Sequence, residues 1–488
     1  MIKDIKHIPV TKESYPFAMA AEKCEFDKIG YIEDEYFMSG TANVYDEDGD
    51  NKPVPIYMDA PYTTRLLIRR PANIKRFSGN VVIEILNASA MIDIDRMWVN
   101  SWKFFTRNGD IFIGITSKGH VVDSLKRFDI ERYRDISWDN PMPERPAPQN
   151  ARGGPFGFLP QFESGLFWDM VVDLAKLLRT DSKLNPIAEY GKSYLFLTGW
   201  SQSGGYIARI LNSFAYLPDN CKGGPLFDGY LTAGSGNSEA PMNAYSRMRP
   251  FGRGGIPNSS VMGGKEPVIA VNTESENRFA FWYGDFDHPE FKFRTWQIPA
   301  SSHDTRYNLI EYYEGRGEED LKRIEISNGW EGCEGLPIDC PYEPIFNAAF
   351  HHLYNWARYG IPAPRAPKIE TEIVIDLEES TDPFGSFVVN RTDVFGNALG
   401  GIRHPAADCP TGTYYSSSRR ADGTVQAMFG HVIVFPPEKL KAIYGDIDNY
   451  RALVTKSTDD AISKGFILPE DRDELIERVV ATAVERGL

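Results

Sequence analysis

The stretch from Tyr194 to Leu211 constrains this chain more than any other part of its sequence. It opens with a short apolar run of β-forming residues, continues as GWSQSGG, and ends in an apolar segment with helical spacing. This pattern predicts a strand, a tight turn and a helix in that order. A serine at the tip of such a turn has a strained backbone, so the residues two positions to either side must be small. Gly199 and Ser203 meet this requirement, and the sequence predicts a nucleophile elbow centred on Ser201.

The residues next to Ser201 affect how this turn is interpreted. Ser203 also lies between small neighbours, so the register could shift by two residues, and a glycine-rich structural turn is the non-catalytic interpretation. At the start of a helix the N–H of Gln202 faces the space that the serine oxygen occupies, and we expect it to bind an oxyanion. Trp200, beside the serine, is predicted to contact the substrate.

Strands and helices alternate along most of the chain. Residues 80–86 and 110–116 are nearly continuous apolar runs, as expected of strands buried on both faces. Helical patterns separate such strands, which predicts an α/β fold with a mainly parallel central sheet flanked by helices. Residues 1–26 are interpreted as an N-terminal lead-in and residues 27–488 as one domain with a C-terminal extension packed on it.

The alternation stops in two segments that we predict to be cap insertions, at about residues 120–165 and 216–262. His120 begins the first, at the sheet edge where active sites form, and is predicted to line the pocket. Arg247 belongs to an arginine cluster in the second and could bind a substrate carboxylate, although such clusters more often offset an acidic surface. Aromatic residues in the two segments suggest a bulky or aromatic ligand.

A serine hydroxyl becomes nucleophilic when a base takes its proton and an acid orients that base. In doubly wound hydrolases the chain order is serine, acid, histidine. Glu276 follows the buried strand pattern at residues 266–272 and is the predicted acid, with Glu274 as the fallback. His303 follows a later short strand and is the predicted base, with His404 as the alternative.

The remaining candidates are weaker. The second oxyanion donor should come from the loop after the earlier buried strand, and the N–H of Ala88 is the predicted group. His288 lies near Asp285 and Asp287, but no ligand spacing supports a metal site there. We expect no metal and no cofactor.

Composition excludes several function classes. The net charge is −15 and no Lys/Arg run occurs, which argues against a nucleic acid or an anionic membrane as partner. No apolar stretch is long enough to span a bilayer, and the first residues lack the pattern of a signal peptide. The five cysteines are scattered without a CxxC motif, which predicts reduced thiols and a cytoplasmic location.

Several segments together resemble a largely uncharacterised group of α/β-hydrolase-domain proteins. They are YIEDEYFMSGTANVY, VVIEILNASA, GDIFIGITSK, GWSQSGGY, PVIAVNTESE, WQIPASSHD, LYNWARYGIPAPRAP and GNALGGIRHPAADCP. The resemblance implies an α/β-hydrolase fold and a triad of Ser201, Glu276 and His303 with ester-hydrolase chemistry. Similar proteins often have aspartate at the acid position, so the choice between Glu274 and Glu276 stays open.

These observations predict a serine hydrolase that cleaves a small-molecule carboxylic ester through an acyl-enzyme. An amidase, a peptidase or an acyltransferase would use the same three residues. A binding protein without catalytic activity on the same scaffold is a further alternative, because a fold does not determine a function. The sequence leaves the acyl group, the alcohol and the oligomeric state open.

Overall fold

The computed structural model resolves the chain into two compact units, which are described separately. It describes residues 1–48, 52–149, 151, 153, 157–235, 239–246, 263–278, 284–327, 330, 332–373 and 388–488. The first unit comprises Met1–Val268, His288–Lys292 and Gly315–Ile326. The second comprises Ile269–Asp287, Phe293–Glu314 and Ser327–Leu488.

The first unit is built on a mixed sheet with the strand order β1-β2-β3-β5-β4-β6-β7. The strands are β1 (Ile2–Ile8), β2 (Tyr31–Glu47), β3 (Pro53–Pro71), β4 (Asn80–Ile85), β5 (Ile111–Ile115), β6 (Tyr194–Trp200) and β7 (Gly229–Ala233). Strands β5, β4, β6 and β7 are parallel, whereas β1, β2 and β3 add to them in antiparallel fashion. All residues of β4 and β5 are buried, so the predicted two-sided burial of these strands is confirmed.

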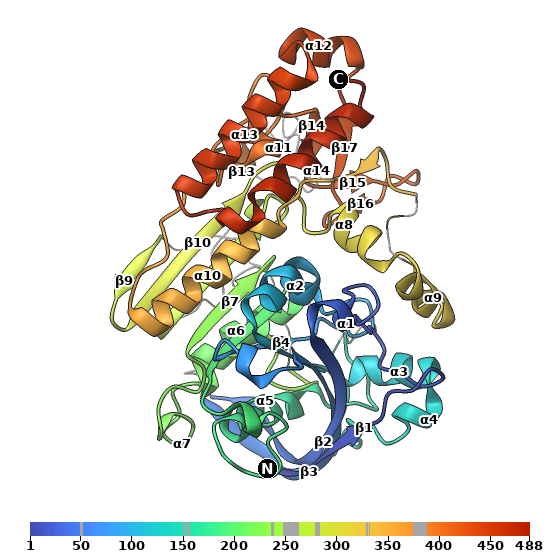
Figure 1. Cartoon of the computed structure of the whole chain (residues 1–488). Coiled ribbons are helices and arrows are strands. Elements are labelled where there is room, and N and C mark those ends of the chain that lie inside the picture. The colour runs from blue at the N-terminus through green and yellow to red at the C-terminus, as the bar shows by residue number, and fades with distance from the viewer. Residues whose placement is uncertain are drawn as a thin grey trace. The chain divides into compact units, whose positions relative to one another are not determined.

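Helices connect the parallel strands along the chain (Figure 1). They are α2 (Arg96–Asn108), α3 (Val122–Phe128), α4 (Ile130–Tyr133), α5 (Phe167–Leu178), α6 (Gln202–Arg209) and α7 (Pro218–Cys221). The first unit also contains α1 (Phe26–Ile29), before β2, and α9 (Arg316–Arg323). Helix α2 buries Trp98 and Phe105, and Trp98 lies against Phe112 of β5 with ring centroids 5.0 Å apart. The predicted α/β fold is confirmed.

The described residues of the segments predicted as lead-in and caps belong to the first unit. Strand β1, within residues 1–26, pairs with β2 and extends the sheet. The two predicted cap segments meet at Tyr245, whose hydroxyl donates to the Met142 carbonyl at 2.8 Å and accepts from the Asn140 amide at 2.7 Å. The division into one domain with cap insertions stays a prediction.

The second unit begins within β8 (Gly264–Thr273), which neighbours β10 (Phe291–Ile298). Its other strands are β9 (Phe286–His288), β11 (Leu336–Pro337), β12 (Thr371–Ile373), β13 (Val388–Asn390), β14 (Gly412–Tyr415), β15 (Ser418–Arg419), β16 (Val425–Gln426) and β17 (His431–Val434). Its helices are α8 (Arg306–Leu309), α10 (Glu343–Tyr359), α11 (Pro405–Asp408), α12 (Pro437–Tyr444), α13 (Ile447–Ser463) and α14 (Arg472–Glu485).

The C-terminal helices contribute apolar packing to the second unit. Helix α14 buries the predicted stripe of Leu475, Ile476, Val479, Val480 and Ala483 and packs beside α13 (Figure 1). Among the residues that the structure describes, no helix combines the length and the apolar character needed to cross a membrane.

Candidate active site

Ser201 lies at the turn between β6 and α6, as predicted from the sequence. Its φ of 56° and ψ of −118° are strained for a residue with a side chain, and its N–H donates to the Ala233 carbonyl of β7 at 2.8 Å. Glycine is required at position 199, because a Cβ there would lie 2.7 Å from the Ser203 carbonyl oxygen. The predicted order of strand, tight turn and helix is therefore confirmed, and Ser201 stands half-buried at its tip.

Ser203 forms part of the turn itself. Its side chain is buried, and its hydroxyl donates to the Trp200 carbonyl at 2.8 Å while accepting from the Trp200 N–H at 3.0 Å. This hydroxyl already makes two hydrogen bonds to the backbone, so it stabilises the turn on which Ser201 stands. Trp200 is only 2% exposed, which places its indole in the core.

The loop after β4 is bonded directly to this turn. The Asn87 side chain donates to the Trp200 carbonyl at 2.7 Å and accepts from the Ser89 N–H at 2.8 Å. Asn87 and Ile94 also exchange backbone hydrogen bonds of 2.9 and 3.0 Å, which close the loop. The N–H groups of Asn87 and Ser89 are thus used inside the loop, and the buried Ala88 lies between them.

In the second unit, His303 and Glu276 form a buried pair. The His303 Nδ1 lies 2.7 Å from Glu276 Oε1. The other carboxylate oxygen of Glu276 accepts from the N–H and the hydroxyl of Thr273, both at 2.7 Å. A carboxylate facing Nδ1 favours the tautomer that carries its proton there, which leaves Nε2 able to accept a proton. The backbone N–H of His303 donates to the Ser275 hydroxyl at 3.0 Å, which fixes the loop.

Glu274, the alternative acid, has other partners. One of its oxygens accepts from the Ala300 N–H at 2.9 Å and the other from the Asn390 amide at 3.1 Å. Ala300 has a positive φ of 54°, so Glu274 holds the strained loop that leads to His303. The structure brings Glu276, and not Glu274, to the imidazole.

The other candidate histidines have different surroundings. His404 is fully buried, its Nε2 lies 2.9 Å from the Pro299 carbonyl, and burial lowers its pKa to about 4. His120 faces the Gly157 carbonyl at 3.2 Å, and its pKa is lowered to about 4 by burial first and by the charge of Lys118 second. His288 is exposed on β9, and the described residues contain no group of three His, Cys, Asp or Glu suited to a metal. Arg247 lies outside the described residues.

Lys118 is a buried charge that we did not single out from the sequence. It follows β5 after Thr116 and Ser117, and its Nζ lies 6.0 Å from the ring centroid of Tyr206 on α6. Burial lowers the pKa of its ammonium group to about 7. A lysine placed immediately after a continuous apolar strand, as in IFIGITSK, is the signal that could have indicated it.

We expect Lys118→Met to raise the free energy of unfolding by ~3–5 kcal/mol at about pH 6. The folded pKa of Lys118 is below its unfolded value, so the unfolded chain binds more protons between about pH 7 and about pH 10.4. Wild-type stability therefore rises with pH over this range, and the gain from the substitution shrinks accordingly. Urea unfolding at several pH values measures this, with the exposed Lys441→Met on α12 as control. An equal gain at about pH 6 and about pH 10 would contradict the prediction.

A parallel sheet with a strained serine at the strand-to-helix turn after β6, and a loop after β4 bonded to that turn, is the arrangement of the α/β-hydrolase class. The sequence matches the family described as alpha/beta hydrolase domain over residues 5–477, and the chain belongs to this family. The match supports hydrolase activity. A comparison with curated proteins finds no match.

Solved structures similar to this chain include hydrolases at low identity. Esterase Est22 is 11% identical with a TM-score of 0.26, over 51% of this chain and 67% of that chain. An alpha-beta serine hydrolase homologue from Coxiella burnetii is 9% identical with a TM-score of 0.27, over 54% of this chain and 91% of that one. A sugar hydrolase from Lactococcus lactis is 10% identical with a TM-score of 0.23, over 54% and 76%.

Proposed function

We propose that this protein is a serine hydrolase that cleaves a carboxylic ester through an acyl-enzyme intermediate. The observation that carries the proposal is the strained backbone of Ser201 at a strand-to-helix turn, which exposes one hydroxyl and commits the other, that of Ser203, to the turn. The bonded pair of His303 and Glu276, which follows later strands in the chain order of this class, supports it.

In the proposed reaction, the Ser201 oxygen attacks the ester carbonyl carbon while its proton passes to Nε2 of His303. The charge of Glu276 stabilises the imidazolium that forms. The negative charge on the former carbonyl oxygen is bound by the N–H of Gln202 and by an N–H of the Asn87–Ala90 loop. Since Asn87 and Ser89 use their N–H groups within that loop, Ala88 remains the proposed donor, with Ala90 as the other choice.

Collapse of the tetrahedral intermediate completes the acylation of Ser201. The carbon–oxygen bond to the alcohol breaks, and His303 returns its proton to the departing oxygen. Water then attacks the acyl-Ser201 ester with His303 again as base, which releases the acid and restores the hydroxyl. No cofactor enters these steps, and we propose a small-molecule ester as substrate and the cytoplasm as location.

Other uses of the same residues predict different products. An amidase would release an amine, and an acyltransferase would form a new ester when an alcohol is added. Phe158 and Tyr245, with ring centroids 5.0 Å apart between the two predicted cap segments, favour a bulky or aromatic substrate. We therefore propose aryl esters as the first substrates to compare with acetate esters of small alcohols.

A fluorophosphonate probe tests the proposal without knowledge of the natural substrate. We expect the probe to label the wild-type protein on the peptide that contains Ser201, because the hydroxyl attacks phosphorus as it attacks a carbonyl. Digestion and mass spectrometry should place the label on Ser201 and not on Ser203. A folded protein that stays unlabelled would indicate a binding protein on a hydrolase scaffold.

A further inference from the structure

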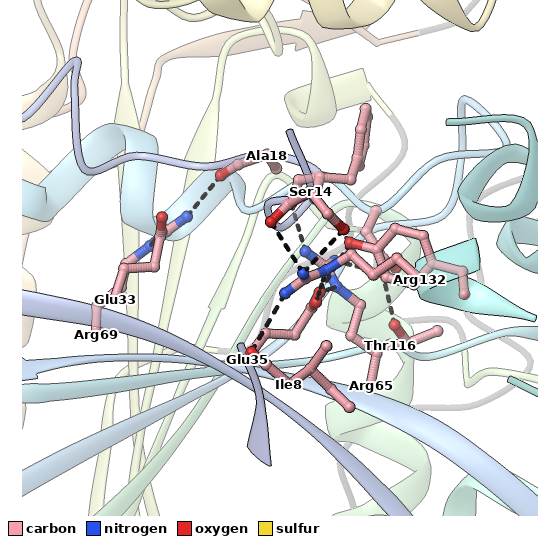
Figure 2. A network of polar contacts seen from close by, with 12 residues as sticks. Ile8, Ser14, Ala18, Glu33, Glu35, Arg65, Arg69, Thr116 and Arg132 are labelled. Atoms are coloured by element: carbon pink, nitrogen blue, oxygen red, sulfur yellow. Dashed lines mark hydrogen bonds and ion pairs between the residues drawn. The ribbon is translucent and has the colours of Figure 1, made fainter. Parts of the chain in front are cut away.

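Two buried arginines lie side by side on β3 with their charges inside the first unit. Arg65 and Arg69 are fully buried, four residues apart, and therefore on one face of the strand. Figure 2 shows the polar network around them. Arg65 binds Glu35 and Arg69 binds Glu33 at 2.7 Å, both on the neighbouring strand β2.

Each arginine also binds the far end of the loop after β4. Nη1 of Arg65 donates to Asp93 at 3.0 Å, and Nη1 of Arg69 donates to Asp95 at 2.5 Å. The same Asp93 oxygen accepts from the hydroxyl of Thr116 at 2.6 Å, at the end of β5. Both aspartates are buried, so these contacts are shielded from competing water.

Hydrogen bonds also fix the start of this loop and the helix that follows it. On β4, Glu84 accepts from the N–H groups of Met97 and Trp98 at 2.8 and 3.0 Å, which caps the start of α2. At the near end Asn87 bonds the Trp200 carbonyl of the elbow, as described above. The backbone from Asn87 to Asp95 is therefore fixed at its start, at its end and against the turn of Ser201.

We propose that Arg65 and Arg69 are positioning residues that, through Asp93 and Asp95, hold the Asn87–Ala90 backbone where its N–H binds the oxyanion. This inference rests on the proposed function. Buried ion pairs contribute little to folding stability, because apolar residues of similar volume often stabilise a protein equally well. Stability alone therefore does not explain this network. An oxyanion donor gains from rigidity, since it must be aimed before charge develops.

A third arginine of this network, Arg132, provides a control for the loop-holding role. Arg132 on α4 also binds Glu35, and it donates to the Pro9 carbonyl at 2.8 Å. It holds the N-terminal segment, and its side-chain hydrogen bonds among the described residues go to Glu35 and to residues 8–14 and not to residues 87–95. Loss of Arg132 should therefore perturb the same buried cluster without releasing the loop.

The experiment compares Asp93→Asn, Asp95→Asn and Arg132→Gln with wild type. We expect the two aspartate variants to lose ~10- to 100-fold in kcat for p-nitrophenyl acetate, with KM within about twofold. The inhibition constant of a trifluoromethyl ketone, which forms a tetrahedral adduct, should rise by the same factor as kcat falls. Arg132→Gln should keep kcat within about twofold while its melting temperature falls.

Hydrogen exchange of the peptide covering residues 86–96 supplies a readout independent of turnover. Exchange there should rise in both aspartate variants and stay unchanged in Arg132→Gln. Aspartate variants that melt earlier but keep wild-type kcat, inhibitor affinity and exchange would overturn the inference while leaving the proposed function intact. A wild-type protein with no esterase activity and no probe labelling would overturn both.

Discussion

Replacing Ser201 by alanine is expected to lower kcat for p-nitrophenyl acetate by ~10⁶-fold, to the background rate of the oxyanion site alone. The side chain at this position supplies the oxygen that attacks the ester carbonyl carbon and carries the acyl group in the proposed mechanism. Ser201 is half-buried at the tip of a turn, so removing its hydroxyl removes few packing contacts. We therefore expect the fold to persist. Steady-state kinetics together with circular dichroism measures both effects.

Ser203→Ala is the matched control for this substitution. It removes a hydroxyl two residues away that makes two backbone hydrogen bonds to Trp200. We expect a stability loss of ~1–3 kcal/mol and a kcat reduced by less than ~30-fold, through a looser turn. If Ser203→Ala were the inactive variant and Ser201→Ala the active one, the register of the elbow would be shifted by two residues.

Much of this fold follows from local pattern. The apolar runs of β4 and β5 predict strands buried on both faces, because a parallel sheet covered by helices leaves neither face in water. The small residues around Ser201 predict the turn, because a Cβ at Gly199 would collide with the first turn of α6. Such signals are contained within a few residues and need no distant partner.

Other features depend on partners that are distant in the sequence. Arg65 and Arg69 occur in TTRLLIRRP, where charges in a strand indicate a solvated face, yet both are fully buried. Each guanidinium pairs with a glutamate of β2 and with Asp93 or Asp95, and these carboxylates lie 26 to 36 residues away in the sequence. Pairing with these distant partners makes the burial tolerable. The choice between Glu274 and Glu276 is likewise decided by loop geometry, since both carboxylates follow the same strand.

The second large effect is expected for Glu276→Gln, which should lower kcat/KM by ~10⁴-fold with little loss of folding. One oxygen of Glu276 accepts from the N–H and hydroxyl of Thr273, so an amide at this position will place its oxygen there. Its NH2 group then faces Nδ1 of His303, which must become an acceptor. The ring proton moves to Nε2, and the imidazole can no longer take the proton of Ser201.

Glu274→Gln separates this tautomer effect from loss of a buried charge. Glu274 accepts from the Ala300 N–H and the Asn390 amide, so glutamine there disturbs the loop before His303 but leaves the tautomer unchanged. We expect its kcat/KM to fall by less than ~30-fold and its melting temperature to fall at least as far as that of Glu276→Gln. Of the two substitutions, only Glu276→Gln changes the group that faces Nδ1 of His303. If Glu274→Gln lost more kcat/KM than Glu276→Gln, the acid would be assigned to Glu274 and Glu276 would be removed from the proposed mechanism.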